Sequence, residues 1–79
     1  MNTIAEQWAS FEVLVMPQDA PAVQRQEMRR AFYSGAEAML RLQYTVGGND
    51  VSENAGVMML EGWHDECSLF AQQVASGDA

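Results

Sequence analysis

Three stretches of the chain place apolar residues at the alternating spacings of three and four that mark one face of a helix. They predict a short helix over residues 4–15 and two long helices over residues 20–46 and 52–75. The apolar stripes of the long helices have the same spacing; they are Met28, Phe32, Gly35, Met39, Leu42 and Val46, and Gly56, Leu60, Trp63, Cys67, Phe70 and Val74. Matching stripes are typical of two antiparallel helices that pack along a seam. We therefore expect a single all-α domain over residues 1–79, with a short N-terminal helix and a long antiparallel helical hairpin.

Residues with known preferences at helix ends mark both ends of the first helix and the start of the second. Thr3 followed by Glu6 is a capping-box pattern that starts the first helix, and Pro17 ends that helix. Asp19 is expected to cap the second helix, with Pro21 in its first turn, where a missing N–H has no cost.

The glycines of the long helices have two expected uses. The chain is expected to reverse with Gly47 or Gly48 as a left-handed cap and with Asp50 or Ser52 as the next N-cap. Gly35 and Gly56 lie on the two apolar stripes, and a glycine inside a helix costs roughly 1 kcal/mol relative to alanine. We attribute both to close approach of the two helices, beside Phe32 or Trp63, and Cys67 to the packed seam.

The apolar content is high for so short a chain. Of 79 residues, 48% are hydrophobic, whereas a domain of this size buries only a modest fraction of its surface. Apolar residues outside the stripes, such as Leu40 and Met58, exceed what one short helix can cover. We expect self-association into a homodimer or larger homo-oligomer.

The charge of −7 comes from eleven acidic residues against four basic ones. Free nucleic acid is a poor candidate partner, because its binding depends on many Lys and Arg side chains. Residues 50–79 carry a charge of −6, and residues 19–46 carry +1. This acidic surface is interpreted as a solubility device, or as a surface that mimics nucleic acid or seeks a basic patch.

No apolar run is long enough to cross a membrane, no signal segment is recognised, and one cysteine cannot form an intramolecular disulfide. We expect a cytoplasmic protein. No pattern typical of an enzyme is present, and no cofactor is expected. Glu61 and His64 have the E-x-x-H spacing of di-iron helical bundles, but we favour a solvated surface pair and expect no metal ligands.

The candidate binding residues fall into two groups. One is the cluster Arg25, Arg29, Arg30 and Tyr33 on the second helix, and the other is the acidic group Glu61, Asp65 and Glu66 on the third. The arginines can form salt bridges with Glu27 and the acidic helix, or they can bind a phosphate-bearing ligand or an acidic partner. The sequence leaves both alternatives open.

The run from Asp19 to Ala36 includes the pattern R-x-E-M-R-R-A-F-Y-x-G-A. It resembles a segment of small uncharacterised proteins of tailed phages and prophages, over about a quarter of the chain. The resemblance carries over no functional residue. It implies an accessory protein of a class whose small acidic helical members often bind and block a host factor, so the host cell cytoplasm is the expected location.

The leading hypothesis is a non-enzymatic phage or prophage accessory protein that binds a host macromolecule, such as an inhibitor of host defence that acts on a host protein. The alternative is an oligomeric small-ligand binder that sequesters a nucleotide-like signal, with arginines on the phosphates and Tyr33 or Tyr44 on the base. The second alternative is a metal-binding helical bundle.

Overall fold

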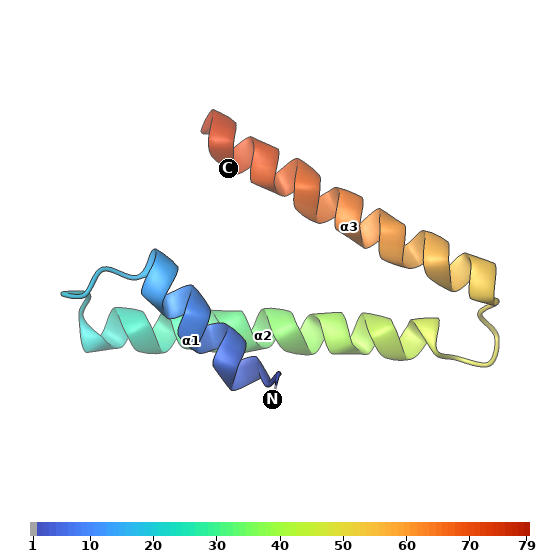
Figure 1. Cartoon of the computed structure of the whole chain (residues 1–79), viewed down its shortest axis with the longest axis horizontal. Helices are drawn as coiled ribbons and strands as arrows, with labels where there is room; N and C mark the ends of the chain where they lie inside the picture. Colours follow the sequence, from blue (N-terminus) through green and yellow to red (C-terminus); the bar gives the residue numbers. More distant parts are fainter. Residues whose placement is uncertain (1) are drawn as a thin grey trace. The chain divides into compact units, whose positions relative to one another are not determined.

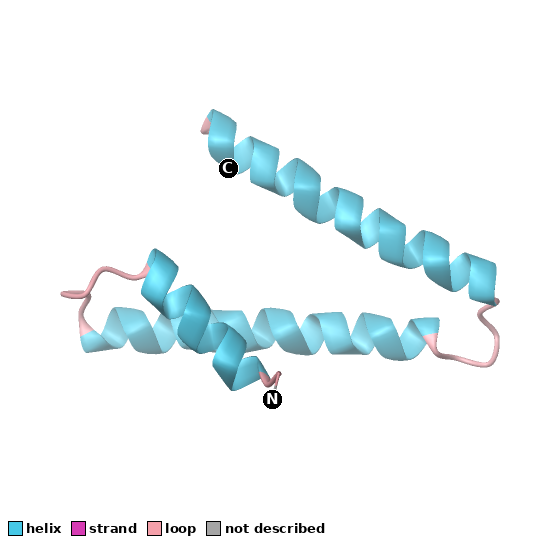
Figure 2. Ribbon diagram, viewed as in Figure 1, coloured by secondary structure: helices cyan, strands magenta, loops and turns pink. Residues whose placement is uncertain are grey.

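The computed structural model describes residues 2–79 and contains three helices, α1 (Ile4–Val15), α2 (Ala22–Val46) and α3 (Glu53–Ser76) (Figure 1). Within these residues there is no strand, so the prediction of an all-α chain of one short and two long helices is confirmed (Figure 2). The chain forms two compact units, Met1–Leu42 and Gln43–Ala79. No helix in the described part has the combination of length and hydropathy that a membrane span requires.

In the first unit, α1 begins at the predicted cap. The backbone N–H of Glu6 donates to the hydroxyl of Thr3 at 3.1 Å, which satisfies one of the N–H groups that the first turn leaves without a helical partner. The same hydroxyl lies 3.2 Å from the carboxylate of Glu6. This local network fixes the start of α1 independently of any packing.

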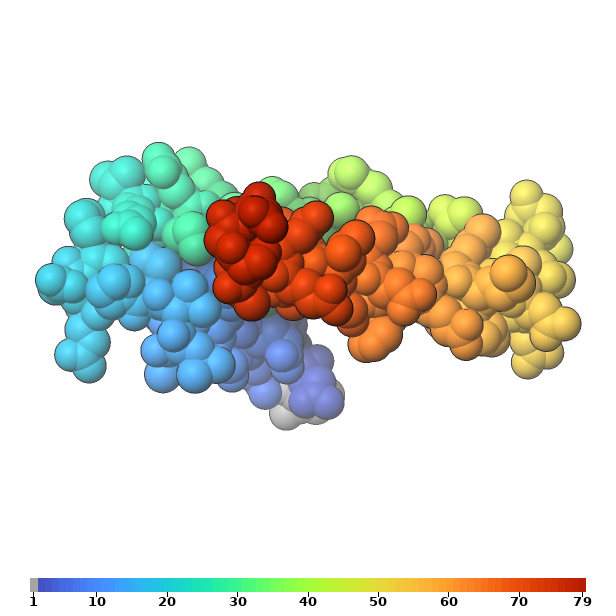
Figure 3. All heavy atoms as spheres, turned by 90° about the horizontal axis from the view of Figure 1, so that it is seen from above, coloured from blue at the N-terminus to red at the C-terminus, as the bar shows by residue number. Residues whose placement is uncertain are grey.

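An aromatic cluster joins α1 to α2. The ring of Phe32 on α2 lies 5.5 Å from the ring of Trp8 and 5.3 Å from the ring of Phe11, and these two rings are 5.8 Å apart. Tilted rings at such distances attract each other beyond the effect of apolar burial. Trp8 and Met16 are the only hydrophobic residues of the described chain that are buried. The blue atoms of α1 lie against the blue-green atoms at the start of α2 (Figure 3).

The start of α2 differs from the prediction. The N–H of Arg25 donates to the carbonyl of Pro21 at 3.1 Å, and α2 begins at Ala22. Pro21 is therefore the residue that directly precedes α2. We expected Asp19, two residues earlier in the chain, in this position. The intervening loop closes on itself, because the N–H of Ala20 donates to the carbonyl of Pro17.

The second unit contains the turn between α2 and α3, and here the expected left-handed glycine is wrong. Among the described residues only Gly77 has a positive φ. Gly48 is needed for another reason: a Cβ there would lie 3.0 Å from an oxygen of Asp50 and 3.1 Å from the carbonyl oxygen of Thr45. The N–H of Gly48 donates to that carbonyl, which tightens the end of the helix.

Both ends of α3 are capped. The hydroxyl of Ser52 accepts from the N–H of Ala55 at 3.1 Å, which decides between the two predicted N-caps. At the other end Gly77 has φ 81° and the N–H of Asp78 donates to the carbonyl of Gln73 at 2.8 Å. These bonds form a Schellman motif, which explains why glycine follows the helix.

The stripe glycines have different surroundings. Gly56 is buried, and a Cβ there would lie 3.0 Å from the Cγ1 atom of Val46, so this glycine does permit a close approach of α3 to the end of α2. Gly35 is exposed and has no atom within 4 Å of a built Cβ. Cys67 is exposed.

The close approach at Gly56 predicts a contrast with Gly62, which lies on the same helix and has open space around its Cβ. Gly62→Leu should raise the free energy of unfolding by about 1 kcal/mol, because leucine favours a helix more than glycine does. Gly56→Leu should lower it by about 1–3 kcal/mol, because the new side chain must displace Val46, whose χ1 is restricted in a helix. Urea denaturation followed by circular dichroism measures both; equal effects of the two variants would contradict the close approach.

Candidate functional site

Four residues predicted from the sequence border one hollow of the first unit. The hollow has a volume of about 660 Å³ and is open to solvent; it is lined by Glu12, Arg25, Gln26, Arg29, Arg30 and Tyr33. Five of these residues lie on one side of α2 over its first turns, and Glu12 comes from α1. The volume lies in the range of small-molecule sites.

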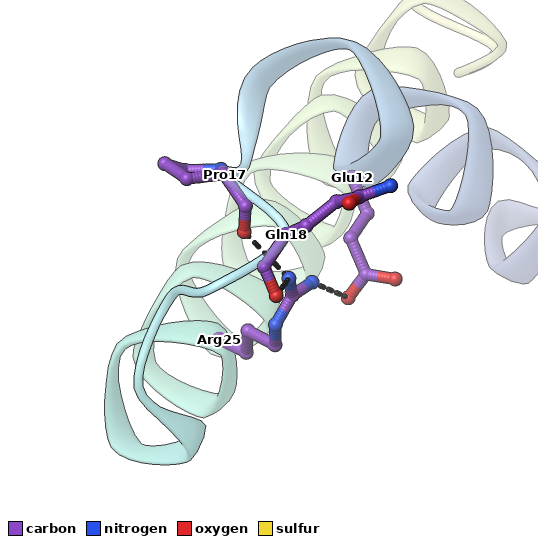
Figure 4. A network of polar contacts seen from close by, with 4 residues as sticks. All are labelled: Glu12, Pro17, Gln18 and Arg25. Atoms are coloured by element: carbon purple, nitrogen blue, oxygen red, sulfur yellow. Dashed lines mark hydrogen bonds and ion pairs between the residues drawn. The ribbon is translucent and has the colours of Figure 1, made fainter.

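Arg25 holds the loop that joins α1 to α2. One of its guanidinium nitrogens, Nη2, donates to the carbonyl of Pro17 at 2.6 Å and to the carbonyl of Gln18 at 3.1 Å, and Nη1 lies 3.5 Å from the carboxylate of Glu12 (Figure 4). Hydrogen bonds from a charged donor are stronger than neutral ones. The side chains of Arg25 and Glu12 are 31% and 35% exposed, so water weakens their attraction only in part. Arg25 is therefore a structural residue at the edge of the hollow.

Arg29 and Tyr33 form a stacked pair one turn apart on α2. The guanidinium carbon of Arg29 lies 5.5 Å from the centre of the Tyr33 ring, which is the range of a cation–π interaction. The Tyr33 ring also meets Phe32 edge-on, with ring centres 6.3 Å apart. The stacked pair is thus anchored to the aromatic cluster that holds α1 on α2.

Neither Arg29 nor Arg30 has a carboxylate partner among residues 2–79. The salt bridge that does form joins Arg25 to Glu12, not to Glu27 as we considered from the sequence. Because Glu12 offsets only one of the three arginines, the lining of the hollow carries a net charge of +2 in a chain whose total is −7. This local excess of positive charge favours an anion.

The acidic group belongs to α3 and thus to the second unit. Glu61, Asp65 and Glu66 are all exposed, and none of them forms a salt bridge with the described residues. Within the described part of the chain no three potential metal ligands come together, so Glu61 and His64 have no third ligand from the same copy.

The sequence did not single out two residues of the hollow, Glu12 and Gln26. A signal for Glu12 is present in its spacing, because it lies four residues after Trp8 and next to Phe11, on the edge of the α1 face that packs against α2. A carboxylate at such an edge is well placed to pair with a cation of the neighbouring helix. Gln26 has no comparable signal.

Comparison of the chain with protein-family models, with curated proteins and with solved structures found no match. The function therefore has to be argued from the hollow and from the exposed surfaces themselves.

The bonds of Arg25 predict that this arginine stabilises the first unit and that Arg30 does not. Arg25→Lys should lower the free energy of unfolding by about 1–2 kcal/mol, because an ammonium cannot bridge two carbonyls and a carboxylate as the planar guanidinium does. Arg30→Lys should change it by less than about 0.5 kcal/mol. Thermal melts at one protein concentration measure both variants; equal melting temperatures would show that the Arg25 contacts do not hold the loop.

Proposed function

We propose that this chain is a non-enzymatic binding protein whose hollow takes a phosphate-bearing small molecule. The observation that carries the proposal is the pair Arg29 and Arg30, two guanidinium groups without protein carboxylates at one hollow. A carboxylate partner would offset the charge of an arginine and occupy some of its donors, whereas Arg29 and Arg30 have no such partner in the described chain.

The chemistry of the lining fits a phosphate. Each guanidinium can give two parallel hydrogen bonds to phosphate oxygens, which adds geometric selection to charge attraction. The amide of Gln26 adds a neutral donor and acceptor. Tyr33 offers a ring that is fixed by its contacts with Arg29 and Phe32, and a fixed aromatic ring favours a flat group such as a nucleobase. A nucleotide combines both features.

This proposal takes up the alternative in which an oligomer sequesters a nucleotide-like signal. Sequestration requires that the ligand is bound and is not converted. A lining of hydrogen-bond donors with the aromatic ring of Tyr33 is suited to binding alone. The resemblance of residues 19–36 to a segment of phage proteins is the reason to place such a binder among phage or prophage accessory proteins in the host cytoplasm. We include self-association in the proposal, because large apolar side chains such as Leu14 and Met58 are exposed.

The acidic group supports a second candidate function, binding to a host protein. Its three carboxylates, Glu61, Asp65 and Glu66, are exposed and have no basic partner in the described chain. A basic patch on a host protein would complement them. Purification from host cells of the chain with Glu61→Gln and Asp65→Asn tests this candidate, because unchanged co-purification of the same host protein would exclude the acidic group as the contact.

For the hollow, titration calorimetry with inorganic pyrophosphate and with ADP at low salt should detect binding to the unchanged chain. The double variant Arg29→Gln, Arg30→Gln should weaken both ligands at least tenfold, because hydrogen bonds to charged groups contribute about 1.5–3 kcal/mol each. Its melting temperature should stay within a few degrees, since neither arginine has an ion pair to lose and the cation–π contact of Arg29 with Tyr33 contributes about 0.5–1 kcal/mol at an exposed site.

Arg41→Gln is the matched control. It removes one positive charge from α2, where the double variant removes two, and Arg41 is bonded to Glu37 at 2.6 Å and does not line the hollow. Its affinity for pyrophosphate should remain within about twofold of the unchanged chain. If Arg41→Gln and the double variant weaken binding equally, the hollow is not the site; if neither ligand binds the unchanged chain, the nucleotide proposal is wrong.

A further inference from the structure

The hollow of the first unit has a carboxylate at one end of its lining. Glu12 of α1 lies beside Arg25, and one of its oxygens is 3.5 Å from Nη1 of that arginine (Figure 4). Arg29 and Arg30 follow one turn later along α2, and Tyr33 follows another turn later. The lining therefore has an order along the helix: a carboxylate, then two guanidinium groups without carboxylate partners among the described residues, then an aromatic ring.

The Arg25 end of the hollow is poorly suited to an anion. Nη2 of Arg25 already donates to the carbonyls of Pro17 and Gln18, so its planar guanidinium cannot turn to a ligand without breaking these bonds. The pair of Arg25 and Glu12 has no net charge, which leaves the amide of Gln26 as the neutral donor at this end.

The second carboxylate oxygen of Glu12 is directed away from Arg25 and has no hydrogen bond within the described residues (Figure 4). The side chain is 35% exposed, so water screens its negative charge only in part. A phosphate group that came close to this oxygen would lose water and would be repelled.

The order of the lining sets how many phosphates the hollow accepts. Residues 33 and 25 are eight positions apart, which is about 12 Å along the helix axis, and residue 29 lies halfway. A nucleotide whose base stacks on Tyr33 places its first phosphates beside Arg29 and Arg30. Each guanidinium can bind one phosphate through two parallel hydrogen bonds, so these two arginines serve two phosphates. A third phosphate extends toward Glu12, where no guanidinium is free to bind it.

We propose that Glu12 is a specificity-determining residue, which makes the hollow selective for nucleotides with one or two phosphates over those with three. This inference rests on the proposed function, because it requires a nucleotide in the hollow. The expected selection is the opposite of what total charge predicts. Three guanidinium groups and one carboxylate line the hollow, so charge alone favours ATP, which carries about one more negative charge than ADP.

Titration calorimetry of the unchanged chain with ADP and with ATP, in a buffer that contains EDTA, tests the inference. The dissociation constant of ATP should be at least about threefold higher than that of ADP, because the third phosphate meets a carboxylate without gaining an arginine. Glu12→Gln should reverse this order, since glutamine keeps the size of the side chain and an oxygen that accepts from Arg25 but has no charge.

Glu27→Gln is the matched control. It removes the same charge from an exposed position next to Gln26, but Glu27 does not line the hollow. ATP should remain the weaker ligand of this variant, with a ratio of the two dissociation constants within about twofold of the unchanged chain, because exposed charges are screened by water and salt.

Inorganic tripolyphosphate tests the order of the lining without any variant. It has no base to stack on Tyr33, so it can move along the arginines away from Glu12. It should therefore bind at least as tightly as pyrophosphate, whereas ATP binds more weakly than ADP. Tripolyphosphate that binds more weakly than pyrophosphate would overturn the arrangement of base, phosphates and Glu12.

The outcomes separate this inference from the proposed function. If ADP binds and ATP binds as tightly or more tightly to the unchanged chain, this inference alone is wrong. It is also wrong if Glu12→Gln leaves ATP the weaker ligand, or if Glu27→Gln reverses the order as well. If neither nucleotide binds, the proposed function fails and the inference fails with it.

Discussion

The contact of Phe32 with Trp8 and Phe11 is the interaction on which the first unit depends. It is the main apolar contact between α1 and α2, and Trp8 at its centre is one of only two buried hydrophobic residues in the described chain. Because it holds α1 across the start of α2, it brings Glu12 within reach of Arg25. The loop between the helices and one wall of the hollow follow from this single packing contact.

The same contact occupies one face of α2. A helix face can pack against one neighbour at a time, and the aromatic side chains of α1 cover the face of α2 at Phe32. The close approach of α3 to α2 that the structure shows is near the turn, where Gly56 meets Val46. Large apolar side chains of α3, such as Leu60 and Phe70, are exposed.

The hollow selects by charge and by planar hydrogen bonding, since Arg29 and Arg30 are left without carboxylates in an acidic protein. The acidic residues Glu61 and Asp65 of α3 are exposed.

The sequence by itself determined those structural features that depend on residues close together along the chain. The three helices and the caps at Thr3 and Ser52 follow from propensity and from bonds that span three or four residues. The sequence also determined that Arg25, Arg29 and Tyr33 lie on one side of α2, because residues four apart share a helix face. Only the tertiary structure decided that α1 occupies the α2 face, that Arg25 serves the loop, and that Arg29 and Arg30 are left unpaired. These depend on contacts between residues far apart in the chain, where several partners of similar chemistry compete and helical spacing does not choose among them.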